Sequence, residues 1–224
     1  MTLLNGPRVP SKTGKATELV VLLHGYGADG NDLIALAPHW QKFLPGAAFV
    51  APNGPSRAPG SPGFQWFPIA RLDPHEMQSG VALAAPAIAR FVDAELGRLG
   101  LPSERLALAG FSQGAMLALH LGLRQKVPPA AIVGFSGVLT DPPPAEGPAA
   151  PVFLTHGGMD TLIPAEAMFM AALSLGAAGI PVEWHLSPGM AHGIDADGLM
   201  LAGNFLKLAF AGRLKREGPI SCPL

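Results

Sequence analysis

Residues 110–114 read GFSQG and carry the side chain of this sequence best suited to covalent catalysis. They match G-x-S-x-G, in which a serine occupies a strained turn between a strand and a helix. Because glycine is frequent in this chain, the surroundings of the motif must decide. An apolar run, RLALAGF (105–111), leads directly into Ser112, and an apolar helical pattern, QGAMLALHLGLR (113–124), follows at once. This context favours Ser112 as a nucleophile.

A second serine offers a test of that criterion. Ser136 lies in GFSG (134–137), which also ends an apolar run. The chain then continues into VLTDPPP, so the second spaced glycine and the following helix are missing. We therefore expect Ser136 to have a structural role.

A serine hydroxyl needs a general base, and a carboxylate must orient that base. In a chain with this motif the acid and then the histidine follow the serine. Once the acid is placed near Asp160, as argued below, only His185 and His192 remain. His185 lies within VEWHLSP (182–188), a strand pattern in which it is explained as a packed or edge histidine. His192 lies in SPGMAHGID, just beyond the C-terminal end of that strand, where ligand chemistry collects in open α/β sheets. We expect His192 to be the base, against the alternative of an ordinary loop histidine.

Five carboxylates between Ser112 and His192 could supply the acid: Asp141, Glu146, Asp160, Glu166 and Glu183. Asp160 follows the strand pattern PVFLTHG (151–157) by three residues, again at the expected C-terminal edge. Asp141 precedes three prolines, where aspartate is an ordinary turn former. Glu166 is explained as part of the first turn of a helix. We expect Asp160 to be the acid.

An oxyanion needs preorganised N–H donors, one from the residue after the nucleophile and one from a loop after an early strand. The backbone of Gln113 is the first candidate. The glycine-rich loop HGYGADG (24–30) supplies the second, and Tyr26 is the candidate donor there. A simple turn is the alternative explanation of this loop.

Acidic residues near the ends of expected helices raise the question of metal binding. Asp29, Asn31 and Asp32 resemble part of a calcium loop, but a turn with a helix N-cap explains them more simply. Asp195 and Asp197 are explained as caps in the same way. The sequence contains no His, Cys and carboxylate set with metal-ligand spacing, so we expect no metal and no cofactor.

Short apolar runs alternate with longer helical patterns, which is typical of a mostly parallel sheet flanked by helices on both faces. The expected strands are 18–25, 47–53, 105–111, 130–137, 151–157 and 182–188. The expected helices are 32–44, 81–99, 113–124, 164–179 and 195–212. With no repeat or dividing linker among 224 residues, the sequence predicts a single α/β domain over 1–224.

One connection is unusually long. Residues 53–80 are rich in proline and glycine, and a loop of this length is typically functional or disordered. The aromatic residues Phe64, Trp66 and Phe67 favour order. Two interpretations remain: a surface excursion packed by its own side chains, or a cover over the substrate. On the second, Trp66 and Phe67 bind the acyl group, and three apolar side chains beside the acid and base complete the wall: Met159, Leu162 and Met190.

Composition limits the partners. Fifteen basic and sixteen acidic residues leave a net charge of -1, so we expect no nucleic acid partner. Charged residues make up 14% of the chain and the mean hydropathy is +0.32, which favours an apolar surface and a possible homodimer. No run approaches the ~18 apolar residues of a membrane helix, and the first fifteen residues do not resemble a signal peptide. A single cysteine, Cys222, excludes an internal disulfide. We expect a soluble, cytoplasmic protein without a membrane span.

Several segments together resemble the phospholipase/carboxylesterase family of α/β-hydrolases, which includes the acyl-protein thioesterases. They are VVLLHGYGADGNDL, FQWF, GFSQGAMLALHLGL, HGGMDTLIP and GMAHGID, in this order from about residue 19 to 197. The resemblance implies Ser112, Asp160 and His192 as the triad, with Tyr26 and Gln113 as backbone donors, in agreement with the residue-by-residue reasoning. One departure is Pro68, which follows the WF pair where members often carry aspartate.

These observations predict a serine hydrolase that cleaves carboxylic esters of a small-molecule or acylated substrate through an acyl-enzyme. Thioesters and lysophospholipids would pass through the same intermediate, so an acyl-protein thioesterase or lysophospholipase is the alternative. A serine peptidase or acyltransferase on the same fold is a less favoured alternative, which a product screen with amine or alcohol acceptors would distinguish. A non-catalytic binding protein is also less favoured, because all three triad residues are present.

Overall fold

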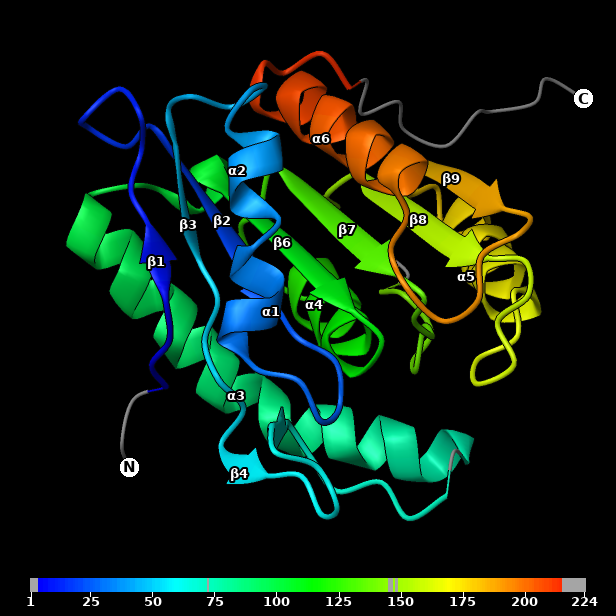
Figure 1. Ribbon diagram of the computed structural model, residues 1–224. Helices are drawn as coiled ribbons and strands as arrows, with labels where there is room; N and C mark the ends of the chain where they lie inside the picture. Colours follow the sequence, from blue (N-terminus) through cyan, green and yellow to red (C-terminus); the bar gives the residue numbers. More distant parts are fainter. Residues whose placement is uncertain (1–3, 72, 145–146, 148, 215–224) are drawn as a thin grey trace, which may run out of the picture.

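The computed structural model describes residues 4–71, 73–144, 147 and 149–214. Its main sheet has the strand order β1-β3-β2-β6-β7-β8-β9, with β1 antiparallel to β3 and every other neighbour parallel (Figure 1). The strands are β1 (Arg8–Val9), β2 (Glu18–Leu23), β3 (Ala47–Val50), β6 (Leu106–Phe111), β7 (Ala131–Phe135), β8 (Val152–Gly157) and β9 (Val182–Ser187). All six expected strands are therefore present, and the parallel arrangement is confirmed.

Three further strands have only two residues each, too short to leave a signal in the sequence. One is β1, and the other two form a small antiparallel hairpin, β4 (Ser56–Arg57) with β5 (Phe64–Gln65). This hairpin lies inside the long connection after β3. The connection is thus ordered by its own pairing, as the packed-loop interpretation expects.

The helices are α1 (Gly30–Ile34), α2 (Ala37–Trp40), α3 (Pro74–Leu99), α4 (Gln113–Leu123), α5 (Glu166–Ala177) and α6 (Ala196–Phe210), with a 3₁₀ turn, η1 (Ser103–Arg105). The single helix expected over 32–44 was wrong, because it is divided into α1 and α2. Pro38 lies in the first turn of α2, where its missing N–H costs nothing, whereas inside one continuous helix it would remove a hydrogen bond.

Helix α3 begins at Pro74, seven residues before the expected start at 81. The Asp73 side chain accepts a hydrogen bond from the Glu76 N–H at 2.9 Å and so caps the helix. The Glu76 carboxylate in turn accepts from the N–H groups of Ala70 and Arg71, both at 2.7 Å. The expected 53–80 loop therefore ends at Asp73, and its last residues form two turns of helix.

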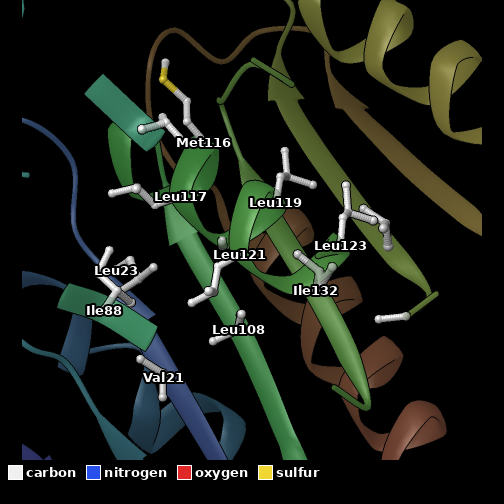
Figure 2. Close-up of a cluster of buried hydrophobic side chains, with 14 of the residues drawn as sticks. Val21, Leu23, Ile88, Leu108, Met116, Leu117, Leu119, Leu121, Leu123 and Ile132 are labelled. Carbon is white, nitrogen blue, oxygen red and sulfur yellow. The ribbon is translucent and has the colours of Figure 1, made fainter. Parts of the chain in front are cut away.

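Two apolar cores lie on opposite faces of the sheet, because successive strand residues point to opposite sides. In β2, Leu19, Val21 and Leu23 join the core with α3, α4 and α5, whereas Val20 and Leu22 join the core with α1, α2 and α6. Figure 2 shows the first core, where side chains of α3 and α4 pack on those of β2, β6 and β7. The helices therefore cover both faces, as expected (Figure 1).

Because the strands are parallel, β2, β6, β8 and β9 all end at one edge of the sheet (Figure 1). The loops after these strands carry the candidate residues. Within the described ranges, no helix is long and apolar enough to cross a membrane. Glu146 and Cys222, which the sequence analysis considered, lie outside the described residues.

Candidate active site

Ser112 stands between the end of β6 and the start of α4, with φ 52° and ψ −114°. A positive φ is costly for any residue except glycine, and such strain is typical of functional turns. The flanking glycines allow the turn. A Cβ at Gly110 would collide with the backbone of Gly114, and a Cβ at Gly114 would collide with the backbone of Leu23 in β2. The motif glycines thus let α4 approach the sheet closely enough to present Ser112.

Asp160 and His192 meet after β8 and β9. His192 Nδ1 donates a hydrogen bond of 2.7 Å to Asp160 Oδ2. The other carboxylate oxygen, Oδ1, accepts from the N–H groups of Leu162 and Ile163, each at 2.9 Å. Both oxygens are therefore held, and the side chain of Asp160 has no exposure to solvent. Because Nδ1 carries the proton, His192 Nε2 is left as a proton acceptor.

The environment of Asp160 keeps it ionised. Burial by itself raises the pKa of Asp160, but hydrogen bonds from the Ile163 N–H and His192 outweigh burial, and the pKa lies below its usual value. An ionised carboxylate in this position orients the imidazole and stabilises its protonated form. The pair can thus serve as a general base held by an acid.

A second histidine, His156 in β8, contacts the same carboxylate and was given no role in the sequence analysis. Its Nε2 lies 2.7 Å from the carbonyl oxygen of Ile163 and 3.2 Å from Asp160 Oδ2. Because a carbonyl oxygen only accepts, Nε2 carries the proton and ties the 160–163 turn to β8. Its place at the start of the HGGMD segment was the only sign of a role that the sequence offered, and it did not indicate the contact with Asp160.

Tyr26 and Gln113, the two candidate backbone donors, lie on the wall of one pocket with Ser112. Gln113 is the first residue of α4, so its N–H has no acceptor within the helix. The loop carrying Tyr26 is held by the long connection: the Gly27 N–H donates to the Phe64 carbonyl at 2.8 Å. The structure therefore brings both residues to the same pocket as the serine.

The pocket has a volume of about 240 Å³. Apart from Ser112 and the two donors, its lining is apolar: Ile69, Met116, Leu162 and Ile163. Among the described residues, none that lines it is charged. Such a cavity can hold a short hydrocarbon group next to the serine hydroxyl.

The other expected substrate residues lie elsewhere. Trp66 and Phe67 are 3% and 2% exposed and belong to the core on the α3 side of the sheet, not to the pocket lining. Trp66 is held there by two hydrogen bonds, from its indole N–H to the His24 carbonyl at 2.8 Å and from its backbone N–H to Gln113 Oε1 at 2.9 Å. Met159 is 64% exposed and Met190 is half-buried, and neither lines this pocket. Of the five substrate-binding residues expected from the sequence, only Leu162 lines the pocket.

The remaining candidates have structural contacts. Ser136 also has a positive φ, 48°, and its hydroxyl donates to the carbonyl of Gly193 at 3.2 Å. Asp29 caps α1 and Asp195 caps α6, in agreement with the capping interpretation. Asp141 binds His120 and Gln78, away from Ser112's pocket. Within the described part of the chain, no group of three or more His, Cys, Asp and Glu gathers around a possible metal position.

Comparison with known proteins decides the family. Residues 4–210 match the family model described as phospholipase/carboxylesterase. The chain belongs to this family. Its members share the α/β-hydrolase fold, so the fold and the resemblance predicted from the motifs are confirmed, together with the expectation of a carboxylic ester hydrolase.

Individual relatives agree with this assignment. The crystal structure of esterase PE8 is 41% identical, with a TM-score of 0.88 over 92% of this chain and 99% of that one. Acyl-protein thioesterase 1 of Schizosaccharomyces pombe is 32% identical over 162 residues, 66% of this chain and 70% of the relative. Esterase YpfH of Escherichia coli is 25% identical over 199 residues, 89% and 86% of the two chains.

Proposed function

We propose that this family member hydrolyses short-chain carboxylic esters at Ser112, with His192 as general base and Asp160 as its orienting acid. One observation carries the proposal. The hydrogen-bonded Asp160–His192 pair lies beside the serine turn, because the His192 ring packs on Phe111, the residue before Ser112, with 4.9 Å between ring centroids.

The reaction follows from this arrangement. Ser112 Oγ attacks the acyl carbonyl while His192 Nε2 takes the hydroxyl proton. The tetrahedral intermediate collapses, the C–O bond to the leaving group breaks, and His192 returns the proton to the departing alcohol. Water then enters, gives its proton to His192 and attacks the acyl-enzyme. The acid is released with Ser112 Oγ reprotonated.

The tetrahedral intermediates carry negative charge on the former carbonyl oxygen. The N–H groups of Tyr26 and Gln113 are the proposed donors to it, because both residues line the pocket with Ser112 and the Gln113 N–H begins α4 without an acceptor in the helix. Preorganised donors of this kind are among the largest contributions to acyl transfer, and loss of one costs about 10²–10³ in kcat.

The pocket size sets the acyl chain. Ligand sites for drug-sized molecules have volumes of roughly 300–1,000 Å³, and this pocket has about 240 Å³. Its apolar walls therefore suit a short acyl group. The absence of charged residues from its described lining gives no support to an anionic head group as the recognised part of the substrate.

Labelling tests the nucleophile directly. A fluorophosphonate should modify wild-type protein on Ser112, as shown by mass spectrometry of the peptide that contains it. The matched control is the other strained serine: Ser136→Ala should still be labelled, whereas Ser112→Ala should not. A label on Ser136 would contradict the assignment.

Rates on matched substrates test the substrate class. Each buried methylene contributes about 0.8 kcal/mol, so kcat/KM should rise by up to about fourfold per carbon until the pocket is full. The same acyl series as thioesters and as lysophospholipids separates the carboxylesterase from the two alternatives. Added amine or alcohol acceptors would reveal a peptidase-like or acyltransferase reaction as a new amide or ester product.

We also propose that the chain forms a homodimer. Its low proportion of charged residues leaves large apolar side chains exposed on α5 and β9, namely Met170, Leu173 and Trp184. Sedimentation equilibrium measures the mass of the particle. A monomeric mass at micromolar concentration would contradict the proposal.

A further inference from the structure

His24 follows directly after β2 and has no exposure to solvent. The Gly54 N–H donates to its Nε2 at 2.9 Å, and its Nδ1 lies 2.7 Å from the carbonyl oxygen of Gly25. Because Nε2 accepts a hydrogen bond, Nδ1 must carry the proton and donate it to Gly25. Burial lowers the pKa of His24, against smaller opposing effects from the Gly25 bond and from Asp29 and Asp32, so the ring stays neutral in this tautomer.

The carbonyl that His24 holds shares a peptide unit with the N–H of Tyr26. A trans peptide is planar and its C=O and N–H point in opposite directions, so holding one fixes the direction of the other. This peptide lies against the nucleophile. A Cβ at Gly25 would stand 2.9 Å from the Phe111 ring and 3.4 Å from Ser112 Cβ. His24 therefore fixes the direction of the Tyr26 N–H, together with the Ala28 N–H, which donates to the same carbonyl at 3.3 Å.

The same histidine is connected to the second donor through Trp66. The Trp66 indole N–H donates to the His24 carbonyl at 2.8 Å, and the two rings pack with 4.9 Å between centroids. On its other side, the Trp66 N–H donates to Gln113 Oε1 at 2.9 Å. Gln113 Nε2 also donates to the Phe67 carbonyl at 2.8 Å. Buried hydrogen bonds thus join the Gly25–Tyr26 peptide to the residue that begins α4.

We propose that His24 is a positioning residue of the oxyanion hole, which aims the Tyr26 N–H through the Gly25 carbonyl and is held in register with Gln113 by Trp66. The proposal rests on the proposed acyl-enzyme reaction with these two donors. It assigns a function to a histidine that touches no substrate. It also explains why Trp66 is buried beneath the site.

Two substitutions separate the two hydrogen bonds of the ring. In His24→Asn, the amide nitrogen takes the place of Nδ1 and keeps the bond to the Gly25 carbonyl. In His24→Gln, the amide reaches the place of Nε2 and accepts from Gly54, but no side-chain donor remains for the Gly25 carbonyl. That carbonyl keeps only the longer hydrogen bond from the Ala28 N–H, at 3.3 Å. The proposal predicts that kcat falls by about 10–100-fold in His24→Gln, with little change in KM, and by at most about threefold in His24→Asn.

A change of substrate atom reports on the oxyanion hole itself. Sulfur is a weak hydrogen-bond acceptor, so a thionoester gains less than the matched oxygen ester from donors aimed at the developing anion. We expect wild type and His24→Asn to prefer the oxygen ester strongly, and His24→Gln to lose about tenfold of that preference. Equal losses on both substrates, or equal losses in both variants, would overturn the proposal.

Folding is checked by the melting temperature and by the final extent of fluorophosphonate labelling at Ser112. If either His24 variant fails to fold, Trp66→Phe decides, because it keeps an aromatic ring and removes only the indole hydrogen bond. It should lower the preference for the oxygen ester by a few-fold, and an unchanged preference would overturn the link. Failure of the proposed function would look different, since wild type itself would then neither hydrolyse esters nor be labelled at Ser112.

Discussion

Among the described residues, two aspartate–histidine pairs have the same separation, 2.7 Å between Nδ1 and a carboxylate oxygen. One is Asp160–His192, and the other is Asp141–His120. Both carboxyl groups have a pKa below the usual value. Neither the hydrogen bond nor the ionisation of the acid distinguishes them.

Their surroundings do. His192 packs on Phe111 next to Ser112, and its acid is held by backbone N–H groups of the 160–163 turn. Asp141 instead joins side chains from separate elements: Gln78 of α3 donates to it at 2.7 Å, and Arg124 after α4 lies 3.9 Å away. Its histidine, His120, belongs to α4, eight residues beyond Ser112, and its acid lies in the connection after β7.

The comparison teaches that the role proposed for an Asp–His pair depends on what lies beside it. The pair after β8 and β9 lies next to Phe111, the residue before Ser112, and Leu162 and Ile163, whose N–H groups hold Asp160, line the apolar pocket. The pair on α4 fastens two helices to the connection after β7. The same kind of hydrogen-bonded pair therefore has a proposed catalytic role in one place and a packing role in the other.

The largest expected effect comes from removing Ser112, the proposed nucleophile beside the Asp160–His192 pair. Ser112→Ala should lower kcat by about 10⁶, because in triads of this kind loss of the serine removes most of the catalysis. Ser136→Ala, which loses only the hydrogen bond to Gly193, should stay within about tenfold of wild type. Steady-state hydrolysis of a short-chain ester measures both. Comparable losses in the two variants would remove the distinction between the serines.

Replacing the aspartate of each pair by asparagine has the next largest expected effect. Asp160→Asn should lower kcat by about 10⁴, because the amide favours the wrong tautomer and orientation of His192. Asp141→Asn should leave kcat within about threefold but reduce the free energy of unfolding by about 1–2 kcal/mol through its lost hydrogen bond. Kinetics and urea unfolding on the two variants give both values. If Asp141→Asn were the damaging change for kcat, the acid would be misplaced.

Acid should affect the stability contributions of both pairs alike. A carboxyl whose pKa is lowered by folding binds protons more readily when unfolded, so its stabilisation is complete above the unfolded value of about 4. That stabilisation is lost as the pH falls through the lower folded pKa. Asp141→Asn and Asp160→Asn should each make stability less dependent on pH in this range. Urea unfolding from pH 7 down to pH 3 measures the slope, and a slope equal to that of wild type would show that the carboxylate stabilises nothing.

The smallest expected effect concerns the apolar pocket beside Ser112, which lies near the Asp160–His192 pair and is not lined by Asp141 or His120. Leu162→Ala removes part of the apolar wall and should reduce the gain in kcat/KM from up to about fourfold per methylene to about twofold. Met159→Ala is the matched control, because Met159 is a nearby apolar residue outside the pocket lining. The series runs from acetyl to hexanoyl esters. A larger effect of Met159→Ala would place the acyl chain on the other side of Asp160.

Much of the site could be predicted because its signals are local. GFSQG places Ser112 at the end of one strand, and Asp160 and His192 each follow the end of another. Parallel strands end at the same edge, so three separate loops were expected to meet there. The sequence could not reveal that His156 shares the carboxylate of Asp160, because that contact depends on how the 160–163 turn folds back on β8.

Two expected helix boundaries differ from the structure although the sequence contained residues that marked the observed ones. The residues DPHE (73–76) form a helix start, with aspartate at the cap, proline at the first position and glutamate at the third, yet the proline-rich surroundings favoured a loop. Pro38 similarly marked the division of the expected 32–44 helix. Both errors concern helix boundaries, which depend on a few capping bonds.

By itself, the sequence determined the order of strands and helices, the strained serine turn and the residues able to form a triad. These depend on spacing along the chain and on backbone geometry within a few residues. Only the tertiary structure decided that the His192 ring packs on Phe111 beside Ser112, that Trp66 donates a hydrogen bond to the His24 carbonyl, and that Leu162 lines the pocket while Met159 does not. Side-chain direction across loops is set by packing between distant segments, and no local pattern encodes it.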